Sequence, residues 1–520
     1  MAPLKSPPYL VLATVCLAVF AINLDTTIVN LALPTLVRQL GASTRDLQWI
    51  VDGYNLSFAA LVLAGGALGD RLGRKPTLVG GLVVFAAASV FGATCTSPGE
   101  LVVARVVMGM AAACIFPTTL SIITNTFTER TQRAKAVGIW GAVTGLGVAV
   151  GPVAGGVLLA HFWWGSIFLA LVPFALLAAV ATVLIVEESK APATHRFDLV
   201  GLGCSTAAIT ALVWTIIEAP DQGWGSTSTI VGFAVAALAA IAFVVVEAKV
   251  SHPMLEVSLF THRAFTAASA SVTIAFFALA GFIFLITQYM QFVRGFSTIS
   301  TGARILPVAC SIAVGSVVGA QLVRKLGTRS IVMVGLALFG SAFLWIAASA
   351  TEEPYLQIAI QMVVMGLGLG LTSAPATESI LSVLPPAKAG VGSAVNDATR
   401  EAGGTLGVAV IGSIATSAYL HHLNTTAVAT LPPALANVAR RSVGAGLELA
   451  AHAPRHQGVL HAAVVDSFMT GLRTGCVVAA GVCYLGVLVA SMLPGRSAPE
   501  VHDAVGTTHG SQLETAAEHH

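Results

Sequence analysis

The chain has 520 residues, of which 56% are hydrophobic and only 10% are charged, and its mean hydropathy is +0.85. A soluble domain carries about 25% charged residues, so this composition excludes a soluble globular protein and predicts an integral membrane protein. The net charge of +2 does not indicate a partner, and the seven cysteines show no CxxC spacing that would suggest a metal site.

The charged residues gather between apolar stretches of about 20 residues, the length of a membrane-spanning helix. In chain order we expect fourteen such helices, at about 9–36, 47–68, 77–95, 100–122, 136–160, 166–186, 199–218, 228–248, 265–289, 300–322, 330–350, 354–377, 391–418 and 466–493. The first stretch is too long for a signal peptide and has no small-residue cleavage site, so we interpret it as a retained span.

Two segments outside the spans have a distinct composition. The long connection at 419–465 contains LPPALANVARRSVGAGLELAAH, and we expect a plain loop there. A short amphipathic surface helix in the second half of that stretch is the alternative. The tail at 495–520 is polar and is predicted to be disordered.

Lysine and arginine are distributed unevenly between the two sets of loops. An even number of spans puts both termini on one side, and sixteen of the 26 basic residues fall on that side, against six on the other and four inside predicted spans. The positive-inside rule therefore predicts cytoplasmic N- and C-termini in a multi-pass protein of the inner (plasma) membrane.

One sequence pattern occurs twice. GGALGDRLGRK at 65–75 recurs in weakened form as GAQLVRKLGTR at 319–329, each time after the corresponding span of a six-helix half. We therefore predict an N-terminal half at 1–190, two inserted helices at 191–262, and a C-terminal half at 263–494 that includes the long loop. Two repeated halves are typical of transporters that expose a central site to each side in turn.

Four stretches together resemble the major facilitator superfamily, in its fourteen-span drug:proton antiporter branch. They are LDTTIVNLALP at 24–34, GGALGDRLGRKP at 65–76, LVVARVVMGM at 101–110 and GLGVAVGPVAGG at 145–156. The resemblance implies an all-α membrane fold of two six-helix halves plus two inserted helices. It also implies a transporter driven by the proton gradient, with no other cofactor.

Asp25 is the only acid in the first apolar stretch. It lies about 16 residues, or about 24 Å, from the start of its helix, and Arg105 lies about five residues inside the opposite end of another, so the two are predicted to share a depth. Insertion of such a residue at a helix centre costs roughly 2.5–3.5 kcal/mol, which favours a functional purpose. Desolvation favours the protonated acid and a nearby arginine favours the carboxylate, so Asp25 can switch between the two.

The resemblance implies that Asp25 takes part in proton coupling and that Arg105 tunes it. The alternative is a fixed bridge that only joins two helices. In the thirteenth helix, Asp397 and Glu401 are four residues apart and share a face. The resemblance implies, more loosely, a proton or cation role for these two acids, although Asp397 can also be a solvated residue at the membrane surface. We predict interfacial positions for Asp52 and Glu378.

Glycines and charged turns are the candidates for moving parts. Gly147, Gly151 and Gly155 form a stripe beside Pro152 and Gly156, which the resembled family treats as its antiporter signature where the halves meet. Gly403, Gly404 and Gly407 occupy the equivalent helix, and generic packing is the alternative for either stripe. A gate at the cytoplasmic surface is predicted from the turn formed by Asp70, Arg71, Gly73 and Arg74, whose basic residues can also serve only as anchors.

We predict export of hydrophobic, often cationic, small molecules such as drugs, dyes or antibiotics in exchange for protons. The alternatives are a dedicated exporter of one endogenous metabolite or lipid, a proton-coupled importer, and a membrane sensor or channel. Aromatic residues are the candidates for substrate contact, although each can equally pack between helices: Tyr54, Phe58, Phe116, Trp140, Phe282 and Tyr289. The sequence has no HExxH and no P-loop, so we predict a monomeric transporter with no metal and no enzyme activity.

Overall fold

A computed structural model of the chain describes residues 7–494, except 191–197, 251–256, 350, 352, 384–388, 427, 429–430 and 453–456. Side chains at 130, 131, 134, 324, 389–394 and 434 are also outside the description. The described residues form helices and no strand. The predicted disordered tail at 495–520 lies outside them.

Fourteen helices in this part of the chain are long and apolar enough to cross a membrane, which confirms the predicted number. The first seven spans are α1 (Pro8–Leu40), α2 (Thr44–Leu72), α3 (Arg74–Thr94), α4 (Pro98–Thr126), α5 (Arg130–His161), α6 and α7 (Ser166–Leu169 and Leu171–Ile185, one span), and α8 (Leu199–Gln222). The others are α9 (Thr227–Lys249), α10 (Arg263–Gln288, extended by the π-helical turn η2, Tyr289–Val293), α11 (Thr298–Leu326), α12 (Thr328–Ala348), α13 (Tyr355–Ser382), α14 (Ala389–Leu423) and α17 (Gln457–Ala490). A 3-10 turn, η1 (Val257–Thr261), precedes α10.

Local sequence signals fix several helix ends. Ser43 caps α2 by accepting from the Asp46 backbone N–H, while the Asp46 carboxylate accepts from the Ser43 N–H at 2.8 Å. The turns that follow α2 and α11 each hold a glycine with positive φ, Gly73 at 118° and Gly327 at 80°. These two glycines occupy matching positions in the repeated sequence pattern, so the two copies share a backbone conformation as well as a sequence.

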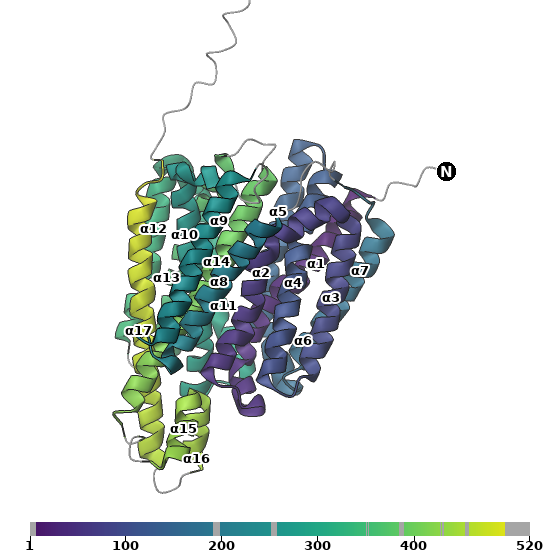
Figure 1. Cartoon of the computed structure of the whole chain (residues 1–520). Helices are drawn as coiled ribbons and strands as arrows, with labels where there is room; N and C mark the ends of the chain where they lie inside the picture. Colours follow the sequence, from purple (N-terminus) through teal and green to yellow (C-terminus); the bar gives the residue numbers. More distant parts are fainter. Residues whose placement is uncertain are drawn as a thin grey trace, which may run out of the picture.

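Helix packing also repeats along the chain (Figure 1). In the first group of helices α1 packs on α5, α2 on α4, and α3 on both α4 and α7. In the second group α10 packs on α14, α11 on α13, and α12 on both α13 and α17. We call these groups the first and second halves; their boundaries at 190 and 262 stay a prediction.

The halves meet along two seams, one between α5 and α11 and the other between α2 and α14. The inserted helices α8 and α9 pack on each other, and α8 also contacts both α2 and α14. The inserted pair therefore covers the α2–α14 seam.

The long connection at 419–465 is mostly helical, so the expectation of a plain loop was wrong. It holds α15 (Pro433–Arg441) and α16 (Val443–Ala451), and Ser442 caps α16 by accepting from the Ala445 N–H. The prolines that start α15 and the serine between the helices are standard start signals that outweigh the glycines of this segment. Figure 1 shows both helices at one end of the molecule, which we call the hairpin face; α1 begins and α17 ends at the opposite terminus face.

Candidate functional site

A buried ion pair joins α1 to α4. Arg105 Nη1 donates to Asp25 Oδ2 at 2.6 Å, and the two side chains are 1% and 0% exposed. Arg105 Nε also donates to the Ile50 carbonyl at 3.0 Å, and its guanidinium lies 4.3 Å from the centre of the Tyr54 ring. The structure thus brings together the acid and the arginine that were predicted to share a depth.

The ion pair leaves two polar atoms of this cluster unsatisfied. Asp25 Oδ1 and the Tyr54 hydroxyl are buried, and neither has a hydrogen-bond partner in the described part of the chain. Buried polar groups are usually paired, so an unpaired carboxylate oxygen beside an arginine marks a site that another proton or dipole can occupy. The geometry fits both proton coupling and a fixed bridge.

The acids of α14 are held differently. Asp397 and Glu401 are partly exposed, and neither forms an ion pair within 4.0 Å with another described residue. Arg400 instead donates to the Thr377 hydroxyl at 3.2 Å and stacks 5.1 Å from the Phe276 ring.

Four of the predicted aromatic residues form a continuous ladder in the first half. Tyr54, Phe58, Phe116 and Trp140 follow one another in edge-to-face contact, with centroid separations of 6.1, 5.8 and 5.0 Å. The Trp140 indole donates to the Thr119 hydroxyl at 3.1 Å. The ladder runs from the Arg105 cation to a half-buried tryptophan.

The other two aromatic residues do not join this ladder. Phe282 packs on Phe343 at 6.1 Å, and Tyr289 donates its hydroxyl to the Thr351 carbonyl at 3.0 Å. Both line a pocket inside the second half, among α10, α12, α13 and α17. The six side chains therefore do not form one site, because a helical face that points into its own half cannot also face the other.

An apolar pocket lies between the halves, lined by α1, α5, α10 and α11. Its polar side chains are Thr27, Asn30 and Thr287, and none of its lining residues is charged. None of these three was predicted to contact substrate, although Thr27 and Asn30 lie within two turns of Asp25 on the same helix. Their spacing from Asp25 was the available signal.

The predicted glycine motif divides between two contacts: the stripe of Gly147, Gly151 and Gly155 packs on α1 inside the first half, while Pro152 and Gly156 reach α11 of the second half. A side chain at Gly147 would meet Phe20 and Asn23, and one at Gly151 or Gly155 would meet Thr27 or Ile28, all on α1. The equivalent glycines of α14 likewise approach α10: Gly403, Gly404 and Gly407.

Only the edge of the motif reaches the α5–α11 seam. A Cβ added at Gly156 would lie only 2.9 Å from the Ile299 Cα of α11. The Pro152 carbonyl lies against Gly302 of α11. Thr298 donates its hydroxyl to the Gly156 carbonyl at 3.2 Å.

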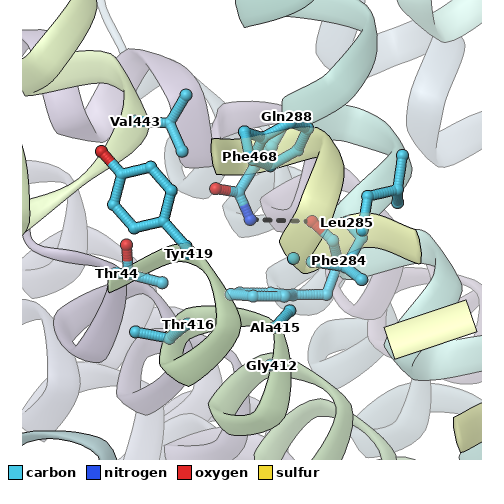
Figure 2. A pocket seen from close by; sticks show the side chains of 12 residues that line it. Thr44, Phe284, Leu285, Gln288, Gly412, Ala415, Thr416, Tyr419, Val443 and Phe468 are labelled. Atoms are coloured by element: carbon cyan, nitrogen blue, oxygen red, sulfur yellow. Dashed lines mark hydrogen bonds between the residues drawn. The ribbon is translucent and has the colours of Figure 1, made fainter. Parts of the chain in front are cut away.

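A second pocket lies at the hairpin face (Figure 2). Gln288 donates within its own helix to the Phe284 carbonyl at 3.0 Å, and Tyr419 donates to the Ala439 carbonyl of α15 at 2.7 Å. Val443 of α16 and Thr44 of α2 complete the wall beside Tyr419. The pocket thus joins the hairpin helices to both halves.

Comparison with known proteins places these features in a family. The model of the Major Facilitator Superfamily matches residues 15–408. The chain belongs to the major facilitator superfamily. It is 32% identical to the multidrug efflux pump LfrA of Mycolicibacterium smegmatis, over 94% of this chain and 95% of that one. It is 31% identical to the tetracenomycin C resistance and export protein of Streptomyces glaucescens, over 98% and 96% of the two chains.

A third relative is the methyl viologen resistance protein SmvA of Salmonella typhimurium, 33% identical over 86% of this chain and 90% of that one. Among solved structures, a bacterial homologue of the human lysosomal transporter Spinster, in an inward-facing and unoccupied conformation, superposes with a TM-score of 0.63 at 15% identity, covering 94% of this chain and 99% of that one. That likeness supports the fold alone. The protein is a multi-pass membrane transporter of a drug and antibiotic efflux family, and is not an enzyme.

The charged turn after α2 is held within the first half of this transporter. Arg74 binds Asp70 at 3.0 Å and donates to the Ser121 carbonyl of α4 at 3.3 Å. A side chain at Gly73 would meet Glu188, and Arg71 is exposed. The predicted gate residues are therefore gathered at the terminus face, and Asp70 forms no hydrogen bond or ion pair with the second half among the described residues.

Asp52 contradicts the expectation of an interfacial position. Its side chain is fully buried in α2, and neither carboxylate oxygen has a hydrogen-bond partner among the described residues. Depth along one helix cannot reveal that α8 and α14 cover this face. Glu378, in contrast, is exposed as expected.

Proposed function

We propose that this transporter exports hydrophobic small molecules, such as drugs, dyes or antibiotics, in exchange for protons. The observation that carries the proposal is the Asp25–Arg105 pair, buried at 2.6 Å with one carboxylate oxygen unsatisfied. The unpaired oxygen supports a proton-carrying role, because a proton can bind there without first breaking the contact with Arg105. The names of the relatives, which include an efflux pump and a resistance and export protein, support the direction of transport.

The distribution of contacts supports alternating access. Described hydrogen bonds between the halves lie toward the hairpin face, where Gln291 donates to the Leu31 carbonyl at 3.0 Å and Thr298 donates to the Gly156 carbonyl. With cytoplasmic termini, as the basic residues predict, this arrangement is closed to the outside. The pocket between the halves then receives substrate from the cytoplasm.

Protonation supplies the coupling step. When Asp25 takes a proton it loses its charge, and the Coulomb attraction to Arg105 falls away. Arg105 keeps the Ile50 carbonyl and the Tyr54 ring as partners, so α4 remains attached to α2 while its tie to α1 weakens. One inward proton drives each neutral substrate outward, and a cationic substrate needs more than one if the exchange is to stay electrically favourable.

Substrate lies in the apolar pocket between the halves. Thr27, Asn30 and Thr287 offer hydrogen bonds there, while the remaining walls bury apolar surface. Of the aromatic ladder, Trp140 is the member exposed enough to touch a ligand. Of the three buried rings, Tyr54 stacks on Arg105, while Phe58 and Phe116 join it to Trp140.

A dedicated exporter of one endogenous metabolite is the second candidate. The observation that favours it is the 31% identity, over nearly the whole chain, to an export protein named for a single antibiotic. Measured substrate breadth separates the two candidates.

Transport in inverted vesicles with an imposed pH gradient tests the coupling. Asp25→Asn should reduce gradient-driven dye movement by about tenfold or more while dye binding persists, because the asparagine cannot release a proton. Asp25→Glu keeps a titratable group and should retain part of the activity. Asp466→Asn, which changes an exposed acid of α17, is the matched control and should behave as the unchanged protein. Dye movement that ignores both the gradient and Asp25→Asn would refute the proposal.

A further inference from the structure

The coupling step above leaves one fully buried acid unused. Asp52 is 0% exposed, and both of its oxygens lack hydrogen-bond partners in the part of the chain that the structure describes. An ionised carboxylate without a partner is strongly disfavoured in a dry interior, so a group in this position is held as the neutral acid. Asp52 can ionise only if water or a cation reaches it.

Asp52 lies on the face of α2 that forms the second seam. Gln48, Asp52 and Leu56 follow at intervals of four residues and share one side of the helix. Gln48 Nε2 lies within hydrogen-bond distance of three acceptors on α14, the Val408 and Ala409 carbonyls at 3.3 Å and the Ser413 hydroxyl at 3.2 Å.

One turn below Asp52, Leu56 packs against α8 and α14, in a cluster with Val213, Ile216, Ile217 and Ala409. Asp52 is therefore enclosed where α2, α8 and α14 meet. Two residues further along α2, Tyr54 points to the opposite side, toward the Arg105 pair.

A polar cavity of about 500 Å³ lies at the hairpin face and extends along this side of α2 as far as Gln48. It is bounded by α2, α8, α14 and α15, and Gln48 is part of its wall. We call this cavity the vestibule. Gln48 itself is 1% exposed, so it separates the vestibule from Asp52, which lies one helical turn deeper.

The charged groups on the surrounding helices are already engaged or lie elsewhere. Arg45 binds Glu218 at 2.7 Å, which joins α2 to α8 at the edge of the vestibule. Asp46 caps α2 through Ser43, and the Arg105 pair lies behind the helix. Asp221 of α8 and Arg440 and Arg441 of α15 line the vestibule, and Glu100 belongs to the capping box of α4 at the hairpin face. The remaining charged side chains on α2 and α14 lie toward the terminus face: Asp70, Arg71, Asp397, Arg400 and Glu401.

We propose that Asp52 is a second proton-binding residue, loaded from the vestibule when Gln48 releases α14, and that its protonated form keeps the α2–α14 seam closed. A hydronium ion in the vestibule gives its proton to one Asp52 oxygen and remains as water. Loss of that proton leaves a charge that requires hydration, which favours separation of α2 from α14. This inference rests on the proposed function, in which protons drive export, but it assigns them a second residue.

Distance measurements across the vestibule test the inference in the full-length protein reconstituted in liposomes. Spin labels at Thr44→Cys on α2 and Leu420→Cys on α14 report the width of the vestibule, in a background in which the exposed Cys310 is replaced by serine. Raising the pH should shift the distance distribution toward longer values. Asp52→Asn should hold it at the short distance at every pH, and Asp52→Glu should restore the pH response.

The same labels distinguish this inference from the coupling role of Asp25. Asp25→Asn should leave the pH response of the seam intact while it abolishes gradient-driven transport. A pH response that is absent in the unchanged protein, or that is the same in Asp52→Asn, would overturn the inference and leave the Asp25 proposal standing. If Asp25→Asn transports normally and Asp52→Asn alone loses the response, the proposed coupling at Asp25 fails and the inference about Asp52 holds.

Discussion

The two seams between the halves differ in which atoms form the contact. Along α5–α11 backbone meets backbone: the Pro152 carbonyl lies against Gly302, and Gly156 faces the backbone of Ile299. Along α2–α14 the contact passes through side chains, chiefly the Gln48 amide against Val408, Ala409 and Ser413, with α8 packed across both helices.

This difference assigns each seam a separate task. Backbone contact has no rotamers to adjust, so the α5–α11 seam can close only when nothing larger than a hydrogen intervenes. Hydrogen bonds exchange with water at little net cost, so the α2–α14 seam can open in proportion to hydration and charge. We propose that the first seam limits how closely the halves approach, while the second controls when they separate.

The largest effect is expected from adding volume to the backbone seam. Gly302→Val would place a side chain on the Pro152 carbonyl, so the halves could not close at the hairpin face. Overpacking of this kind costs about 1–3 kcal/mol, which shifts a conformational equilibrium by about 5- to 150-fold. Dye transport in vesicles should fall by a similar factor, and an impermeant thiol reagent should label a cysteine placed at Thr298 faster.

Gly145→Val is the matched control for that change. A Cβ at Gly145 of α5 meets nothing within 4 Å, so the substitution adds the same volume without a clash. Transport by this variant should stay near that of the unchanged protein. Equal loss of transport in both variants would show that the α5–α11 seam is no more sensitive to added side-chain volume than the rest of α5.

Sequence reasoning identified the spans and the Asp25–Arg105 contact because both follow from position along a helix. The ends of each apolar stretch set the depth of its residues in the membrane. Two residues at the same depth on helices that pack together can form a contact, as Asp25 and Arg105 do. The family resemblance also pointed to a transporter, which the relatives bear out.

Rotation about the helix axis was beyond the same reasoning. Gly151 faces α1 and not the other half, Phe282 faces the interior of its own half, and Asp52 is fully buried. An almost uniformly apolar helix carries little amphipathic pattern, so its sequence does not say which neighbour each face meets. Of the hairpin helices, α16 corresponds to the alternative of a short helix in the second half of the connection, whereas α15 was not predicted, since its sequence lacks the apolar length of a span.

A moderate effect is expected from weakening the side-chain seam. Gln48→Leu keeps the volume of the residue but removes the amide that reaches α14, at a cost of about 1 kcal/mol. The seam should open more often, by about fivefold. A cysteine at Thr416, which lines the vestibule, should react faster with an impermeant thiol reagent.

Gln39→Leu provides the control for Gln48→Leu, because Gln39 is an exposed glutamine of α1 at the same face of the molecule. It should leave the labelling rate at Thr416 unchanged. If Gln48→Leu also leaves that rate unchanged, the α2–α14 seam does not depend on its buried amide and the contrast between the seams disappears.

The smallest effect is expected where α8 touches the second half at the surface. The Trp224 indole, in the turn after α8, donates to the Ser417 hydroxyl of α14 at 3.0 Å, in an exposed position. Trp224→Phe and Ser417→Ala remove the same hydrogen bond, so each should change the labelling rate at Thr416 by about twofold or less, consistent with a bond that exchanges with water. The double variant should match the larger single effect, because only one interaction is lost. Additive effects would mean that Trp224 and Ser417 act through separate contacts. The packing of α8 on α14 would then resemble the α5–α11 seam more than the α2–α14 seam.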